Sequence, residues 1–214
     1  LETELFAEER LKMAMSRDMK ERIWVTKFDD GSLKEFYSDF MNMEHDPSVQ
    51  IIPIVVTSYG GSLDNLNAMR DIIKSSEKPV SVTAIGKAMS AGLALLVSGT
   101  KGLRFVAPGT SLMLHEASSG AMGKVEEIVS YTKHLDELNK LFIKNMAEDM
   151  GRTESWLRKE ISKRNNADWF MTAEEAVEIG LADAIGVDRS YTSPPQQVIA
   201  VDVKEKKALR RKKA

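Results

Sequence analysis

The sequence contains no cysteine among its 214 residues, which excludes disulfide bonds, thiolate nucleophiles and metal sites built on cysteine. It also lacks a run of about 18 apolar residues, so we expect no membrane-spanning helix. The first ten residues are acidic and mixed, which argues against a signal peptide in this sequence. We therefore expect a protein of a reducing compartment, the cytoplasm, with no metal and no other cofactor.

The formal net charge of −2 is unevenly distributed along the chain. Residues 203–214 contain seven Lys or Arg and a single Glu, so this segment carries +6 and leaves −8 for the rest. A basic tail can contact nucleic acid or an acidic partner, but most such runs are solvated chain ends. We expect an N-terminal arm over residues 1–20, a polar and then basic tail over residues 187–214, and no nucleic acid partner.

Strand and helix patterns alternate through the chain, which is long enough for one substantial core. The pattern predicts strands over 22–28, 51–57, 80–85, 103–107 and 111–115, helices over 32–43, from 63, from 91, over 124–150 and from 154, and a last strand or turn over 181–185. Ser32 and Ser62 are predicted N-caps, and Thr172 with Glu175 forms a predicted capping box. This alternation is typical of an α/β fold with ligands at the carboxyl ends of parallel strands.

The stretch over residues 83–98 is the centre of this pattern. A β-branched strand ends at Gly86, and small apolar residues at helical spacing follow Ser90. A serine at such a turn presents its hydroxyl beside the unpaired N–H groups of a helix N-terminus. Ser90 is either a nucleophile or a small residue that packs a tight joint. Gly60–Gly61 and His115 fall at the ends of two other predicted strands, which favours a shared site.

A neutral serine needs a base within hydrogen-bond reach to act as a nucleophile. His115 ends a buried strand level with Ser90, whereas His45 lies in a turn and His134 on the surface of the long helix. His115 is therefore the best-placed base, although it can equally be a structural histidine. Lys87, three residues before Ser90, offers a Ser–Lys pair as an alternative.

A histidine base also needs an acceptor that orients its second ring nitrogen. Asp168 lies in a turn before the capping box and is the first candidate for this role. Taken alone it reads as a turn or cap residue, and Asp183 and Asp64 are weaker rivals.

The chain resembles the proteolytic subunit of Clp protease over roughly residues 20–186. Four segments carry the resemblance in the family's order: Val56–Ser62 resembles N-S-P-G-G-S with Tyr59 in place of proline, Ile85–Gly92 resembles G-x-A-x-S-x-G, Leu112–Glu116 resembles M-I-H-Q, and Asn166–Ala176 with Gly180–Asp183 resembles D-R-D-x-F-[LM]-[ST]-A-x-E-A and Y-G-L-[IV]-D. The resemblance implies a peptidase domain over residues 21–186. The implied fold is the spiral of strand–strand–helix units shared with crotonases, with a protruding long helix.

The resemblance also implies the roles of individual residues. Ser90 would be the nucleophile, His115 the general base and acid, and Asp168 the orienting carboxylate. The backbone N–H groups of Gly61 and Ala91 would form the oxyanion hole. The implied reaction is hydrolysis of peptide bonds in extended or unfolded polypeptides through an acyl-enzyme.

For the assembly, the resemblance implies two stacked heptameric rings joined by the long helix, and an AAA+ unfoldase is a possible partner. Gly60, Gly120 and Met122 would contact an extended peptide substrate. Two alternatives stay open: a maturation protease of the same fold that cleaves few structural proteins without an ATPase, and a non-catalytic ring subunit.

Overall fold

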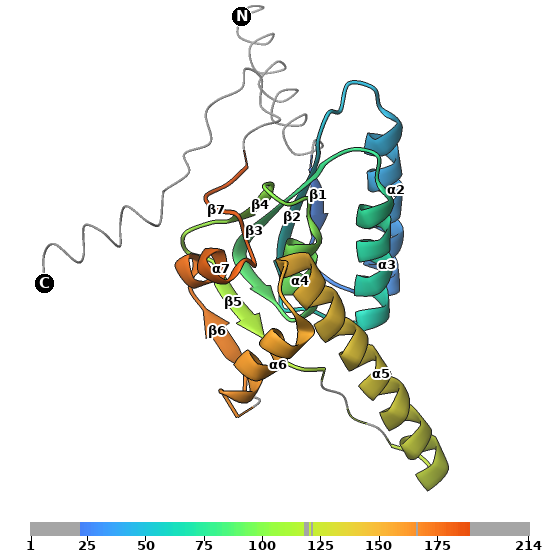
Figure 1. The fold of residues 1–214 in the computed structure, drawn as a ribbon. Helices are drawn as coiled ribbons and strands as arrows, with labels where there is room; N and C mark the ends of the chain where they lie inside the picture. Colours follow the sequence, from blue (N-terminus) through green and yellow to red (C-terminus); the bar gives the residue numbers. More distant parts are fainter. Residues whose placement is uncertain (1–21, 118–119, 121, 166, 189–214) are drawn as a thin grey trace, which may run out of the picture.

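The computed structural model describes residues 22–117, 120, 122–165 and 167–188 (Figure 1). The predicted N-terminal arm lies outside these residues, as does the predicted tail apart from residues 187 and 188. In chain order the elements are β1 (Ile23–Val25), α2 (Asp30–His45), β2 (Ile52–Ser58), α3 (Leu63–Ser75), β3 (Val80–Met89), α4 (Ala91–Ser98), β4 (Arg104–Val106), β5 (Ser111–Leu114), α5 (Val125–Met150), α6 (Glu154–Ser162), β6 (Trp169–Met171), α7 (Ala173–Ile179) and β7 (Ala184–Ile185).

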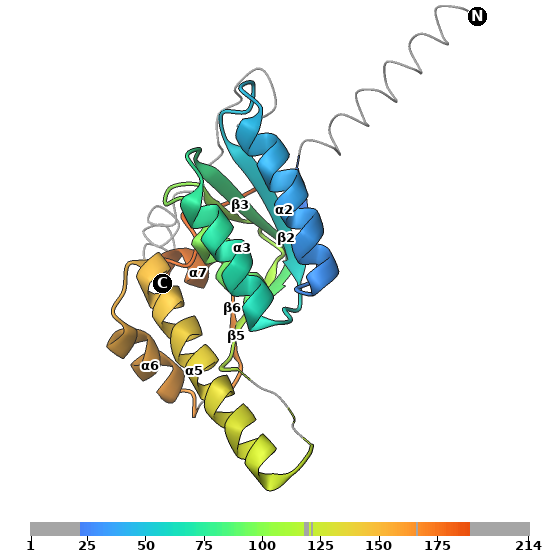
Figure 2. The ribbon, with the colours of Figure 1, turned by 90° about the vertical axis from the view of Figure 1, so that its right-hand side faces the viewer.

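The strands form one mixed sheet in which parallel pairs dominate. The order is β1-β2-β3-β4-β7, while β5 pairs with β3 and β6 pairs with β5. Only the β5–β6 pair is antiparallel among the described strands. Helices α2 and α3 lie side by side over one face of the sheet, as Figure 2 shows. The predicted α/β fold is therefore confirmed.

Strand β3 bends in the middle, which corrects the prediction that it ends at Gly86. Its first half pairs with β4 through residues 82–84, and its second half pairs with β5 through residues 87–89. The bend lies at Gly86, whose φ of +71° suits glycine far better than other residues. Because β5 supports the second half, the strand continues to Met89 and ends directly before Ser90.

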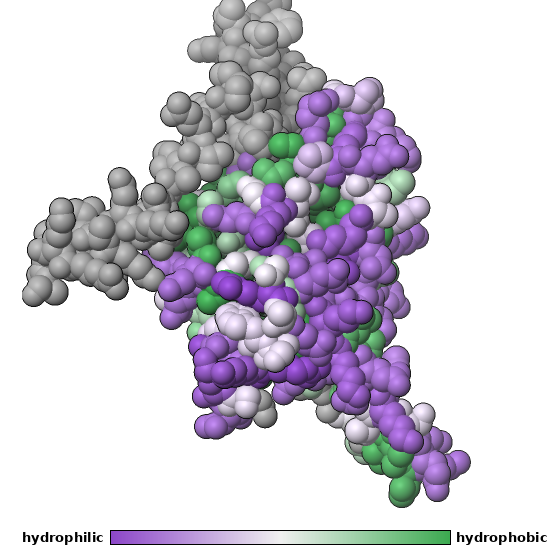
Figure 3. All heavy atoms as spheres, viewed as in Figure 1, coloured by the Kyte–Doolittle hydropathy of each residue, from purple (hydrophilic) through white to green (hydrophobic). Residues whose placement is uncertain are grey.

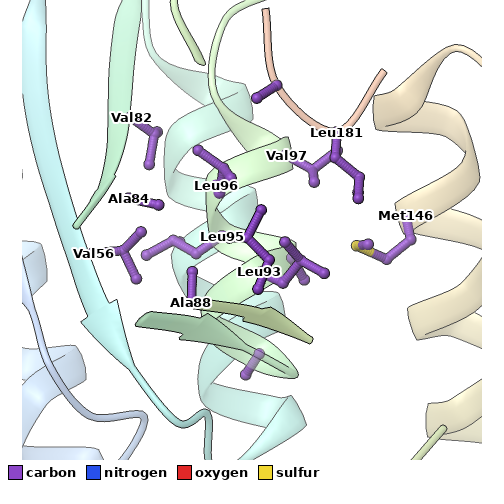
Figure 4. Close-up of a cluster of buried hydrophobic side chains, with 14 of the residues drawn as sticks. Val56, Val82, Ala84, Ala88, Leu93, Leu95, Leu96, Val97, Met146 and Leu181 are labelled. Carbon is purple, nitrogen blue, oxygen red and sulfur yellow. The ribbon is translucent and has the colours of Figure 1, made fainter. Parts of the chain in front are cut away.

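Helix α4 is the centre of the hydrophobic core. Every residue of this helix is buried, as expected for a helix that is apolar on all sides. Leu95 and Leu96 pack toward Val82 and Ala84 of the sheet, and Met146 of α5 and Leu181 approach from the other side (Figure 4). The helix that follows Ser90 is thus held firmly on both sides, which fixes the position of its N-terminus.

The helix caps agree with the sequence at two of three predicted positions. Ser62 caps α3, and Thr172 with Glu175 forms the capping box of α7. The prediction that Ser32 caps α2 was wrong. Asp29 is the cap, because its carboxylate accepts a hydrogen bond from the Ser32 N–H, and the Ser32 hydroxyl accepts one from the Asp29 N–H in return.

Helix α5 matches the predicted long helix and protrudes from the body (Figures 1 and 2). Its 26 residues span about 39 Å at the usual rise of 1.5 Å per residue. The C-terminal part is buried through Phe142, Ile143 and Met146, whereas Val125 and Val129 near the N-terminus are exposed. The fold anchors one end of the helix and leaves the other free to contact something else.

Candidate active site

Ser90 has a strained backbone between β3 and α4. Its φ of 52° and ψ of −120° place a non-glycine residue in a sparsely populated region, which typically costs about 1–3 kcal/mol. The Ser90 N–H donates a hydrogen bond of 2.9 Å to the carbonyl of Met113 in β5. Paired strands and a buried helix therefore hold this turn, and strain maintained in this way is common at catalytic nucleophiles.

The glycine turn after β2 lies directly against the serine turn. A Cβ atom at Gly60, whose φ is +109°, would lie 2.9 Å from the Cβ of Ser90 and 3.2 Å from the nitrogen of Ala91. A Cβ atom at Gly61 would lie 2.8 Å from the carbonyl oxygen of Phe28. Real Cβ atoms do not approach other atoms this closely, so only glycine fits at either position.

Two backbone donors flank this contact. Within the part of the chain that the structure describes, the N–H groups of Gly61 and Ala91 donate no hydrogen bond. The Ala91 N–H is one of the unpaired donors at the N-terminus of α4. Neither group is therefore engaged by another described residue, and each can donate to an incoming acceptor.

Strand register brings His115 and Asp168 to the same place. Met89 pairs with Met113, so His115 follows β5 near the Ser90 turn. Leu114 pairs with Trp169 in the antiparallel β5–β6 ladder, so the next residue, His115, comes opposite Asp168. The Nδ1 atom of His115 lies 3.7 Å from Oδ1 of Asp168. This distance exceeds a normal hydrogen bond.

The family model described as Clp protease matches residues 7–189. The chain belongs to the Clp protease family. Membership of this family supports a peptidase activity, which is the hydrolysis of peptide bonds. Clp proteases generally form oligomeric rings that pair with unfoldases.

The rivals that the sequence left open have other surroundings in this chain. Asp183 accepts hydrogen bonds from the Arg104 guanidinium at 2.8 Å and 2.6 Å, so it is already paired. The Lys87 ammonium lies 4.2 Å from the ring centroid of Tyr59, a cation–π contact. Asp64 is exposed in the first turn of α3. None of these groups contacts the described atoms of Ser90 or His115 in a hydrogen bond or ion pair.

The remaining histidines lie on helices α2 and α5, and two of the three predicted peptide-binding residues border a surface hollow. His45 is in the last turn of α2, and His134 is exposed on α5. Gly120 and Met122 border an open hollow of about 340 Å³ together with Glu127, Ile128 and Tyr131. The Met122 side chain is fully exposed. In the described part of residues 120–124 there is no strand.

Sequence reasoning missed three residues that lie around this site. The buried Ser58 hydroxyl accepts a hydrogen bond of 3.1 Å from the Gly60 N–H and so helps to shape the glycine turn. Glu116 and Asn139 are hydrogen-bonded to each other beside His115. Ser58 belongs to the glycine motif and could have been found there, whereas nothing in the sequence around Asn139 marks it.

No group of three or more His, Cys, Asp or Glu side chains among the described residues is arranged to hold a metal ion. Over the same residues, none of the helices combines the length and apolar character that crossing a bilayer requires.

Proposed function

We propose that this member of the Clp protease family is a serine endopeptidase that cleaves extended or unfolded polypeptides inside an oligomeric chamber. The observation that carries the proposal is the strained Ser90 turn, which lies against the glycine turn, while the N–H groups of Gly61 and Ala91 donate to no other described residue. A structural serine at a tight joint needs neither the strain nor a pair of unused donors. A nucleophile that forms an oxyanion needs both an exposed hydroxyl and such donors.

The proposed reaction proceeds through an acyl-enzyme. His115 removes the proton from the Ser90 hydroxyl, whose oxygen attacks the peptide carbonyl carbon and forms a tetrahedral oxyanion. The N–H groups of Gly61 and Ala91 donate to that oxyanion, and each such donor contributes about 3 kcal/mol of transition-state stabilisation. His115 then protonates the leaving amine. Water next attacks the ester carbonyl while His115 removes a proton from the water. His115 returns a proton to the Ser90 oxygen, which releases the new carboxylic acid.

Asp168 has the orienting role in this proposal. It lies on the Nδ1 side of the imidazole, which favours the tautomer that carries its proton on Nδ1 and leaves Nε2 free as the base. The 3.7 Å separation, and a Ser90 hydroxyl that bonds to none of the described residues, mean that the three groups must move closer for catalysis. Catalytic hydrogen bonds often shorten in this way when substrate binds.

The proposed assembly uses the exposed end of α5. An N-terminal half with Val125 and Val129 in solvent suits contact between two stacked heptameric rings. Gly60, Gly120 and Met122 are proposed to contact an extended polypeptide, with main-chain hydrogen bonds giving loose specificity. An AAA+ unfoldase as partner and the cytoplasm as location remain predictions of the sequence.

Single substitutions test the proposed chemistry. Ser90→Ala should abolish hydrolysis of a fluorogenic peptide and labelling by a fluorophosphonate. Asp168→Asn should reduce kcat by about 10⁴-fold, because it favours the wrong imidazole tautomer. Asp64→Asn is the matched control and should stay within about twofold of the unmodified protein, since Asp64 is exposed on α3. Lys87→Gln tests the Ser–Lys alternative and should keep fluorophosphonate labelling, because the Lys87 ammonium makes its contact with the Tyr59 ring. Full activity of Ser90→Ala, or loss of fluorophosphonate labelling in Lys87→Gln, would overturn the assignment.

A further inference from the structure

Asn139 links helix α5 to the segment that follows His115. Its Oδ1 atom accepts a hydrogen bond of 2.9 Å from the Ala117 N–H. Its Nδ2 atom donates a hydrogen bond of 3.2 Å to Oε1 of Glu116. Both ends of one side-chain amide are therefore engaged by two consecutive residues, directly after the candidate base. A two-point contact fixes orientation as well as position, which a single hydrogen bond does not.

The two hydrogen bonds of Asn139 hold the chain where the pairing of strand β5 ends. Strand β5 ends at Leu114, and its last pair is Leu114 with Trp169. Residues 115–117 are half-buried but lie beyond the ladder. Among the described residues, the Ala117 N–H and the Glu116 carboxylate have no other hydrogen-bond partner than Asn139. The backbone just after the imidazole is thus held by one side chain on another element.

We propose that Asn139 is a positioning residue, which through Glu116 and Ala117 fixes the direction of the His115 imidazole between Ser90 and Asp168. This inference rests on the proposed serine peptidase function. Among the described residues, the Asn139 side chain forms hydrogen bonds with Ala117 and Glu116 and with none of Ser90, His115 and Asp168. Its loss should therefore lower the chemical rate while leaving substrate binding nearly unchanged, because a misdirected base slows proton transfer.

The donor and acceptor pattern allows a swap experiment. Asn139→Asp places a second carboxylate against Glu116, which removes the donor and adds repulsion. Asn139→Asp combined with Glu116→Gln restores the link, because the Gln amide donates to the new carboxylate and the Ala117 N–H still donates to it. Glu116→Gln alone keeps the link, since a turned glutamine amide accepts from Asn139. Asn145→Asp adds the same charge to the same helix and is the matched control.

The measurements are kcat and KM for a fluorogenic peptide and the rate of fluorophosphonate labelling. Asn139→Asp should lower kcat and the labelling rate about tenfold, the effect of losing a hydrogen bond of ordinary strength. Its KM should change less than about twofold, and the double variant should recover most of the kcat. The control Asn145→Asp should resemble the unmodified protein in all three quantities.

Two results would overturn the positioning role. One is an unchanged kcat in Asn139→Asp, and the other is a double variant that is as slow as Asn139→Asp. A general loss of folding would lower both kcat and the melting temperature without recovery in the double variant, so it also counts against the proposal. If the unmodified protein neither cleaves peptide nor reacts at Ser90, the proposed function itself fails, which is a separate outcome.

Discussion

Gly60 and Ser90 are in such close contact that a Cβ atom on the glycine would lie 2.9 Å from the Cβ of the serine. Gly60→Ala should therefore displace the Ser90 turn, and its φ of +109° adds backbone strain. We expect fluorophosphonate labelling to fall at least about tenfold, because small displacements of a nucleophile slow its reaction strongly. Gly109→Ala is the control, since nothing lies within 4 Å of its Cβ position. Equal labelling of the two variants would show that the contact is unimportant for reactivity.

The positive φ of Ser90 predicts which of two inactive variants, Ser90→Gly or Ser90→Ala, has the higher free energy of unfolding. Ser90→Gly relieves strain of about 1–3 kcal/mol, which exceeds the entropic penalty of about 0.5–1 kcal/mol for glycine. Ser90→Ala keeps the strain, so Ser90→Gly should be the more stable of the two by about 1 kcal/mol in urea unfolding. At Ser98, the last residue of helix α4, the order should reverse in favour of alanine. The same order at both positions would mean that Ser90 stores no strain.

Local sequence signals predicted those parts of the fold that depend on neighbouring residues. The caps at Ser62 and Thr172 involve partners three residues away, and their motifs were sufficient. At α2 the same signal was ambiguous, because Asp29 and Ser32 can each cap and the two form one box. The structure decides between them by where the helix begins, which depends on the turn after β1.

Distant partners explain what the sequence did not predict. Strand β3 continues past Gly86 because β5 pairs with its second half, and no local pattern reports that pairing. Arg104 and Asp183 are 79 residues apart, so Asp183 looked like a candidate orienting acid until its partner was known. Asn139 is likewise 22 residues from Ala117. The positions of Ser90, His115 and Asp168 were predictable because each lies in a motif at a strand end.

The ion pair of Arg104 with Asp183 predicts acid sensitivity. Burial raises the pKa of Asp183, but hydrogen bonds and charge from the Arg104 guanidinium, with the Arg104 and Gly102 N–H groups, outweigh it and lower the pKa. Since the folded pKa is below the unfolded value of about 3.9, the pair stabilises the fold fully above that pH. This contribution is lost as the pH falls through the folded pKa of Asp183.

Asp183→Asn tests this contribution. Arg104 is only 2% exposed, so the substitution leaves a buried guanidinium without its counter-charge, which should cost about 3–5 kcal/mol of unfolding free energy at neutral pH. The variant should also lose less stability than the unmodified protein between about pH 5 and pH 2, because its side chain does not titrate. Urea unfolding across this range measures both effects, with the exposed Asp64→Asn as control. Parallel pH curves for Asp183→Asn and the unmodified protein would contradict the assignment.

The exposed end of α5 predicts which substitution would separate the proposed pair of stacked rings. Val125 is 71% and Val129 is 49% exposed, and residues four apart share one helix face. Figure 3 shows hydrophobic side chains near the free end of this helix, where a monomer would leave them in water. Burying one valine contributes about 1.5–3 kcal/mol, and this gain is repeated in every subunit of a ring. A charge on this face should therefore separate stacked rings without unfolding the subunits.

Val129→Glu is the variant that tests this, with Ser130→Glu as control because it adds the same charge at the next, exposed position of the same helix. Native mass spectrometry should show Val129→Glu particles of half the mass found for the unmodified protein and for the control. The subunit fold should persist, because the core contacts of α5 begin at Phe142, more than three turns away. If Val129→Glu keeps the full mass, the rings do not meet through this face. If Ser130→Glu also halves it, the effect is general electrostatic repulsion and the valine face has no special role.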